Sequence, residues 1–201
     1  MFRVNEPELQ GARLRLRTWH RNDVVAQEQW PDYADPFHAL WNLPRAMSFD
    51  DQFGIASQRR IWAVEDLQHR LIGRVSIREI EQRARRSRLG ITMGAPYVGQ
   101  GLGTEALNLF LNYYFGALNF VTMALDVAAF NRRAVHCYER LGFRYIESDW
   151  RYAGLESHLY LLNSPAYHDL KPFFRRSRHG TFVEFFEMEL QRNQWNNTRG
   201  S

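Results

Sequence analysis

Three closely spaced glycines, set between an apolar alternation and a stretch of helical periodicity, constrain this chain more than any other feature. Residues 89–93 alternate as a strand does, residues 94–96 interrupt the pattern, and Gly99, Gly101 and Gly103 follow. Glycine permits tight turns and close backbone approach, and the first N–H groups of a helix have no acceptors within that helix. The stretch therefore predicts a strand, a loop and a helix whose positive end favours a phosphate or pyrophosphate.

The rest of the chain predicts a sheet with helices on its faces. Alternating or continuous apolar runs predict strands at residues 12–18, 61–64, 71–81, 89–93, 121–127, 143–150 and 157–162. Capping residues and helical spacing predict a short helix within residues 19–30, with Asn22 or Asp23 as its cap, and a helix at residues 49–59. Two further helices are predicted, one after the glycine loop and one from Asn131 to Gly142. This order predicts an α/β fold of the α+β type, with a mixed, mostly antiparallel sheet of about six to seven strands flanked by helices.

The helix after the glycine loop carries its apolar stripe at Leu107, Phe110, Leu111 and Tyr114. Residues 106–125 have no formal charge over 20 positions, which is the length of a membrane span. Asparagines and Gly116 interrupt this run, so a buried helix followed by a buried strand is the better interpretation, and no membrane partner is expected.

The fold pattern predicts one domain over residues 1–163 and a C-terminal extension over residues 164–201. Residues 181–190 fit either a strand or a helix. The extension contains five phenylalanines, Phe173, Phe174, Phe182, Phe185 and Phe186. So many aromatic residues predict that the extension packs on the domain or on a second subunit, which leaves a homodimer open.

The basic residues are almost all arginine. Lys171 is the only lysine among 26 Lys and Arg residues, and the formal net charge is +4. Arginine suits anionic ligands, but this excess is too small to indicate nucleic acid by itself. The clusters at residues 83–88 and 175–178 fit solvated turns, or surfaces that steer an acidic substrate or ribosomal RNA. The lone Cys137 excludes an intramolecular disulfide, and with an N-terminus that lacks an apolar run it favours a cytoplasmic protein.

The glycine loop differs from two better-known phosphate loops. It has no lysine, as a P-loop requires, and its glycines are spaced G-x-G-x-G rather than G-x-G-x-x-G. Residues 98–103 instead match the Q/R-x-x-G-x-G/A loop at every position except Val98, and Asn131, Tyr138 and Gly142-Phe143 match a second motif. Over residues 12–163 the chain resembles the GNAT superfamily of acyl-CoA N-acyltransferases, and most closely the branch of ribosomal-protein N-terminal acetyltransferases.

This resemblance implies an acetyl-CoA-dependent N-acetyltransferase that transfers the acetyl group directly to a primary amine, without a metal. Tyr138 would protonate the departing sulfur, and the amide of Met93 would polarise the thioester carbonyl. The residues implied to contact the co-substrate are Thr92, Met93, Gly94, Val98, Gly99, Gln100, Gly101, Leu102, Gly103, Thr104, Asn131 and Tyr138. We find no spaced set of His, Cys or carboxylate residues typical of a metal site.

The sequence does not identify the general base that would take the proton from the amine. Many relatives carry a glutamate two residues before the glycine of the central strand, where this chain has Arg88. Glu79 faces inward if its strand is regular, whereas a bulge near Arg78 turns it to solvent. Asp126 and His158 are further candidates.

The acceptor is also open, between a protein N-terminus and a small-molecule amine. The missing glutamate permits a second hypothesis, a non-catalytic acyl-CoA-binding or regulatory module, although the retained Tyr138 opposes it. An RNA-binding protein is a third hypothesis, and no aromatic RNA-binding signature accompanies the charge.

Overall fold

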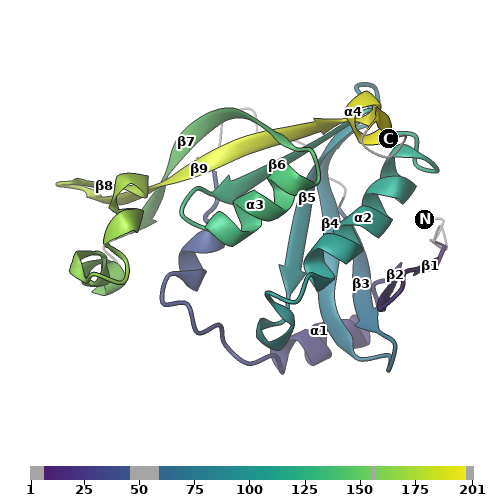
Figure 1. Ribbon diagram of the computed structural model, residues 1–201, viewed down its shortest axis with the longest axis horizontal. Coiled ribbons are helices and arrows are strands. Elements are labelled where there is room, and N and C mark those ends of the chain that lie inside the picture. The colour runs from purple at the N-terminus through teal and green to yellow at the C-terminus, as the bar shows by residue number, and fades with distance from the viewer. Residues whose placement is uncertain (1–6, 46–58, 155–156, 198–201) are drawn as a thin grey trace. The chain divides into compact units, whose positions relative to one another are not determined.

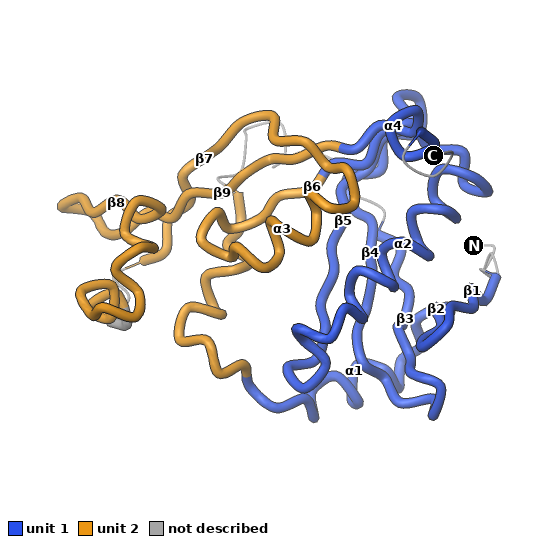
Figure 2. The backbone as a smooth tube through the Cα atoms, in the orientation of Figure 1, with its two compact units in different colours: residues 1–32, 57–124, 190–201 blue, residues 33–56, 125–189 orange. Residues whose placement is uncertain are grey.

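The chain forms two compact units (Figure 2). Its computed structural model describes residues 7–45, 59–154 and 157–197. Unit 1 comprises residues 1–32, 57–124 and 190–201, and unit 2 comprises residues 33–56 and 125–189. The helix predicted at residues 49–59 lies almost entirely outside the described residues.

Unit 1 is a largely antiparallel sheet. Its strands, in spatial order, are β1 (Leu9–Gln10), β2 (Leu14–Thr18), β3 (Arg60–Asp66), β4 (Leu71–Glu81), β5 (Arg86–Met93) and the first part of β6 (Thr122–Ala128). Every neighbouring pair is antiparallel except β5 and β6, which are parallel. A parallel pair needs a crossover, and the glycine loop and the helix that follows it provide one, as the sequence predicts.

Helix α2 (Leu102–Phe115) covers this sheet, and Figure 1 shows it in front of β3 and β4. The predicted stripe of Leu107, Phe110, Leu111 and Tyr114 is fully buried. The ring of Phe110 lies 4.7 Å from the ring of Trp62 in β3. In the described part of the chain, no helix has the length and apolar character needed to cross a membrane.

Another helix of unit 1, α1 (Arg21–Glu28), begins before the predicted caps Asn22 and Asp23. His20 is the N-cap, and Asp23 closes a capping box by accepting a hydrogen bond from the His20 N–H at 2.7 Å. The carboxylate of Asp23 also accepts two hydrogen bonds from Arg17. Burial tends to raise the pKa of Asp23, but these bonds outweigh it, so the pKa lies below its usual range.

Unit 2 is built on the remainder of β6 and on strands that follow it in the chain. Its strands lie in the order β6, β9 (Gly180–Gln191, of which residues 180–189 belong to this unit), β7 (Arg144–Gly154), with β8 (Phe174–Ser177) also paired to β9. Helix α3 (Arg132–Arg140) follows β6, and short 3-10 helices occur at η1 (His38–Asn42), η4 (Ser157–Asn163) and η5 (His168–Phe173). The core of this unit includes Phe37, Phe130, Val183 and Phe185.

The segment beyond residue 163 belongs partly to each unit. Within unit 2, β9 forms an antiparallel ladder with β7, and residues 181–190, which fitted a strand or a helix, are a strand. Within unit 1, Arg192, the first residue of α4 (Arg192–Asn197), donates its backbone N–H to the Val121 carbonyl at 2.9 Å. Leu190 and Trp195 are both buried.

The mixed, mostly antiparallel α/β fold is confirmed, with two differences from the sequence prediction. The described residues contain nine strands, because β1, β8 and β9 add to those predicted from the first 163 residues. The strand predicted at residues 157–162 is wrong, because this stretch is the 3-10 helix η4. Leu159 and Leu162 are its buried residues, and their spacing of three matches the turn of a 3-10 helix rather than the two-residue repeat of a strand.

Candidate active site

The glycine loop in unit 1 joins the end of β5 to the start of α2 (Figure 1). A short 3-10 helix, η3 (Ala95–Tyr97), follows Gly94, whose N–H donates to the Ile72 carbonyl at 2.9 Å. Gly99 and Gly101 have φ angles of 82° and 76°, in the left-handed region where a side chain is strained. Gly101 is the N-cap of α2, so its left-handed conformation stands at the point where the chain enters the helix.

The loop presents a row of backbone donors. Within the described structure, no hydrogen bond is made by the N–H groups of Gly99, Gln100, Gly101, Leu102 or Gly103. A Cβ atom placed on Gly99 would meet nothing within 4 Å, so the backbone there faces open space. Successive N–H groups at the positive end of a 14-residue helix fit a pyrophosphate, and the loop thus suits the coenzyme A expected from the sequence.

The first part of β5 pairs in parallel with β6. This ladder joins Arg86, Ser87 and Arg88 to Thr122, Met123 and Ala124, all within unit 1. On its other side β5 pairs with β4 to its last residue, Met93, which lies opposite Gly73. The side chain of Met93 packs on this glycine, because a Cβ atom there would lie 2.5 Å from the Met93 sulfur.

The second motif occupies α3 in unit 2, and its residues have clear structural roles. Asn131 is the N-cap of α3, and its side chain accepts a hydrogen bond from the Ala134 N–H. Tyr138 is 9% exposed, and its ring makes an edge contact with Phe143 at 5.8 Å. Gly142 ends the segment with a φ angle of 93°. The spacing of the motif therefore encodes a capped helix that presents a mostly buried tyrosine.

Glu79 lies on an irregular strand, so the regular geometry that would turn it inward is absent. The register of β4 against β5 shifts between Arg78 and Glu81, and Glu79 has a φ angle of 51°. Its side chain is 46% exposed, and it accepts a hydrogen bond from the Arg88 Nε at 2.9 Å. The six residue-to-residue steps from Gly73, opposite Met93, to Glu79 span about 20 Å of extended strand, which places Glu79 far from Met93.

Arg88 explains this arrangement. It was expected at an exposed hairpin tip, but the tip is the turn before β5, and Arg88 itself is only 2% exposed. A buried guanidinium needs a compensating charge, and Glu79 supplies it across the two strands. The arginine at the position of the expected base therefore pairs with the carboxylate of Glu79, the leading candidate for that base.

The other two candidate bases do not lie with the loop in unit 1. Asp126 is on the part of β6 that belongs to unit 2, where its Oδ2 lies 2.7 Å from the Arg151 Nη1. The side chain of His158 lies outside the described structure. No group of three or more metal-binding side chains occurs in the part of the chain that is described.

The sequence did not reveal Arg13 and Glu105 as parts of the loop. The strand predicted at residues 12–18 places Arg13 on the face opposite Leu14 and Leu16. In the structure its side chain reaches the loop and the first turn of α2. No local pattern joins these residues, since 92 positions separate them.

A model of the acetyltransferase (GNAT) domain matches residues 13–144, which include both the glycine loop and the Asn131–Phe143 motif. The chain belongs to the GNAT acetyltransferase family. This GNAT protein is an acetyl-CoA-dependent N-acetyltransferase that acts on amines, and acetyl-CoA is its co-substrate.

Curated relatives of this GNAT protein include two spermidine N(1)-acetyltransferases. The one from Escherichia coli K12 is 31% identical over 130 residues, which cover 64% of this chain and 67% of the relative. The one from Vibrio cholerae is 38% identical over 84 residues, which cover 42% of this chain and 49% of the relative. The resemblance to ribosomal-protein N-terminal acetyltransferases stays a prediction.

Solved structures share the fold. A spermidine N-acetyltransferase chimera from Vibrio cholerae and hSSAT gives a TM-score of 0.62 at 25% identity, covering 92% of this chain and 99% of the other. A crystal structure described as an acetyltransferase gives 0.65 at 18% identity, covering 96% and 90%. The Vibrio cholerae enzyme in complex with CoA and spermine gives 0.59 at 22% identity, covering 93% and 100%.

Proposed function

We propose that this GNAT acetyltransferase transfers the acetyl group to a primary amine of a small polyamine such as spermidine. The choice of a polyamine as the acceptor rests on the similarity to spermidine N(1)-acetyltransferases, at 31% identity over 130 residues for one relative. The reaction itself follows from the family, whereas substrate choice depends on side chains around the acceptor. A protein N-terminus is the competing acceptor.

The glycine loop and the end of β5 are proposed to hold acetyl-CoA, which supplies the acetyl group as a thioester. The N–H groups of residues 99–104 would bind the pyrophosphate, and the backbone of residues 92–94 would bind the pantetheine arm. The fit is supported by the left-handed Gly99 and Gly101 and by the row of backbone donors that follows them. The Met93 N–H would polarise the thioester carbonyl, and the Asn131 cap would start the helix that carries Tyr138.

Tyr138 is proposed to donate its hydroxyl proton to the sulfur as the thiolate leaves. A phenol hydroxyl carries a proton that it can give to a leaving thiolate as a general acid. Its burial on α3 limits the orientations of the ring. The amine must lose a proton before attack, and neither Glu79 nor Asp126 is well suited to take it, because each already holds an arginine.

The acceptor is tested by measuring the release of free coenzyme A with a set of amines. We expect spermidine and spermine to give a kcat/KM at least 100-fold above that of short peptides with alanine or serine at the N-terminus. A preference for the peptides would reject the polyamine proposal and favour a protein acceptor.

The role of Tyr138 is tested with Tyr138→Phe and with Tyr145→Phe as a matched control. Tyr145 lies shortly after α3 and is 55% exposed. We expect Tyr138→Phe to lower kcat by about 100-fold, at the lower end of general acid catalysis, without changing coenzyme A affinity. Unchanged turnover in Tyr138→Phe would remove this tyrosine from the mechanism, and Tyr145→Phe should behave as the wild type.

A homodimer and a cytoplasmic location also stay proposals. The aromatic residues of the C-terminal segment motivate the first, and the lone Cys137 motivates the second. Sedimentation of the purified protein and fractionation of the host cell test them separately.

A further inference from the structure

The glycine loop lacks the side-chain donor that its family motif provides. Val98 stands where the motif has Gln or Arg, so the first position of the loop offers no polar side chain to a phosphate. A different cation is nevertheless present. Arg13, which lies just before β2, reaches the loop from another part of unit 1.

Arg13 bridges the loop and the helix with separate donors. Its Nη1 donates to the Gln100 carbonyl at 3.1 Å, and this carbonyl lies between the two left-handed glycines. Its Nε donates to the Glu105 Oε2 at 2.7 Å, and its backbone N–H donates to the Glu105 Oε1 at 2.8 Å. The Nη2 lies 3.5 Å from the position of a Cβ on Gly101, so the positive charge adjoins the N-cap of α2.

The charge of Glu105 makes this bridge important for an anionic ligand. Glu105 lies in the first turn of α2, where a carboxylate stabilises the helix but repels a phosphate at the same helix end. Its side chain is 20% exposed, which limits screening by water. Arg13 compensates this charge and at the same time fixes the carbonyl of the loop.

We propose that Arg13 is a positioning residue for the phosphates of coenzyme A, which holds the Gln100 carbonyl against the first turn of α2 and neutralises Glu105. This role rests on the proposed function of the glycine loop as the pyrophosphate site. The bridge keeps the loop in the conformation that directs its N–H groups outward. It supplies through Arg13 the cationic group that Val98 lacks.

The test compares the affinity for coenzyme A with the KM for two acetyl donors. Calorimetry gives the coenzyme A dissociation constant for the wild type, Arg13→Ala and Arg13→Lys, and assays use acetyl-CoA and S-acetylpantetheine, which has no phosphate. We expect Arg13→Ala to weaken coenzyme A by at least 10-fold and to raise the KM of acetyl-CoA equally, with kcat and the KM of S-acetylpantetheine within twofold. Arg13→Lys keeps the charge but not the fork, so a loss of three- to 10-fold is expected.

Arg15→Ala is the matched control. Arg15 lies two residues after Arg13, inside β2, and makes its ion pairs with Glu8 and Glu65 instead. Its replacement should change coenzyme A affinity by less than twofold. Glu105→Gln should leave the affinity for coenzyme A unchanged or increase it. The double variant Arg13→Ala with Glu105→Gln should bind coenzyme A at least threefold more tightly than Arg13→Ala alone.

Two results would overturn the role of Arg13: an Arg13→Ala variant within twofold of the wild type, or an equal loss with S-acetylpantetheine. If Arg13→Ala does not fold, Arg13→Lys decides by the same criteria. If the wild type has the same KM for acetyl-CoA and S-acetylpantetheine, the loop is not the phosphate site. If the wild type has a lower KM for acetyl-CoA, and Arg13→Ala keeps the same ratio of the two KM values, the loop remains the phosphate site but Arg13 has no role in it.

Discussion

Replacing the buried Arg151 in unit 2 by methionine should destabilise the protein strongly. Its side chain is only 2% exposed, and its Nη1 lies 2.7 Å from the Asp126 Oδ2. The same nitrogen donates to the Leu43 carbonyl at 2.8 Å, and the guanidinium lies 4.0 Å from the Phe185 ring centroid. Methionine fills similar space but leaves the Asp126 carboxylate, itself 9% exposed, without its arginine.

The expected loss in the free energy of unfolding is about 4 kcal/mol. Breaking a buried ion pair from one side costs about 3–5 kcal/mol, because the remaining charge stays desolvated. For a chain of this size each kcal/mol corresponds to roughly 2–4 °C, so the melting temperature should fall by about 8–16 °C. Urea unfolding and calorimetry of Arg151→Met against the wild type measure this change.

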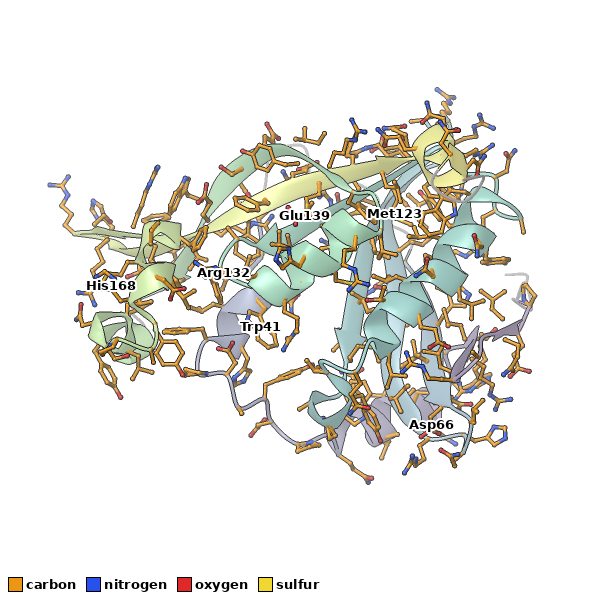
Figure 3. The ribbon with its side chains drawn as sticks, viewed as in Figure 1. Trp41, Asp66, Met123, Arg132, Glu139 and His168 are labelled. Atoms are coloured by element: carbon orange, nitrogen blue, oxygen red, sulfur yellow. The ribbon has the colours of Figure 1, made fainter. Side chains whose placement is uncertain are left out.

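A second arginine supplies a matched comparison. Arg132 (Figure 3), also in unit 2, makes an ion pair with Asp169 of nearly equal length, 2.6 Å, but the two side chains are 57% and 56% exposed. Arg132→Ala should therefore cost less than about 1 kcal/mol. Removing both charges in Arg151→Met with Asp126→Leu should recover stability relative to Arg151→Met alone. Equal losses for Arg151→Met and Arg132→Ala would refute the argument that burial determines the cost.

Four further substitutions test other parts of unit 1. Gly101→Ala forces an alanine to a φ angle of 76° and should lower the free energy of unfolding by about 1–2 kcal/mol. Gly103→Ala lies inside the helix and should raise this free energy by up to about 1 kcal/mol. Thermal melts measure both, and a less stable Gly103→Ala than Gly101→Ala would contradict these conformations. Burial tends to raise the pKa of Asp66, but hydrogen bonds from Arg70 and Gln68 lower it overall, so its stabilisation is complete above its ordinary pKa and is lost as the pH falls through the lowered value. Asp66→Asn should flatten the acid side of a urea-midpoint profile, and an unchanged profile would oppose this. Glu79→Gln should keep kcat within twofold, and a 100-fold loss would make Glu79 the base after all.

Local patterns were sufficient to predict the elements around the glycine loop. The β4 strand has the bounds that its alternation predicts, residues 71–81, and α2 buries all four residues of its predicted stripe. These elements depend on periodicity and on glycine conformations, which a short window of sequence contains. The 3-10 helix η4 was missed because three- and two-residue spacings are hard to distinguish over seven residues.

The candidate base could not be settled from sequence for a different reason. A bulge reverses the direction of every later side chain, and nothing around Glu79 signals one, since its φ angle of 51° belongs to a residue other than glycine. Likewise, the role of Arg88 depends on a partner on the neighbouring strand. Such pairings are tertiary and leave no local period in the sequence.

The arginine bias has a structural explanation in these pairings. Arg17 contacts Asp23, Glu65 and the Thr18 carbonyl, and Arg13 and Arg151 each join groups from separate segments. A guanidinium offers five donors in a fixed fork, whereas a lysine ammonium is a single point of charge. The buried carboxylates of the described residues each contact an arginine; they are Asp23, Glu65, Asp66 and Glu187. The proposed polyamine acceptor would therefore bind through more exposed acids, whose attraction is screened by salt. Its affinity should depend on ionic strength more than the stability of the fold does.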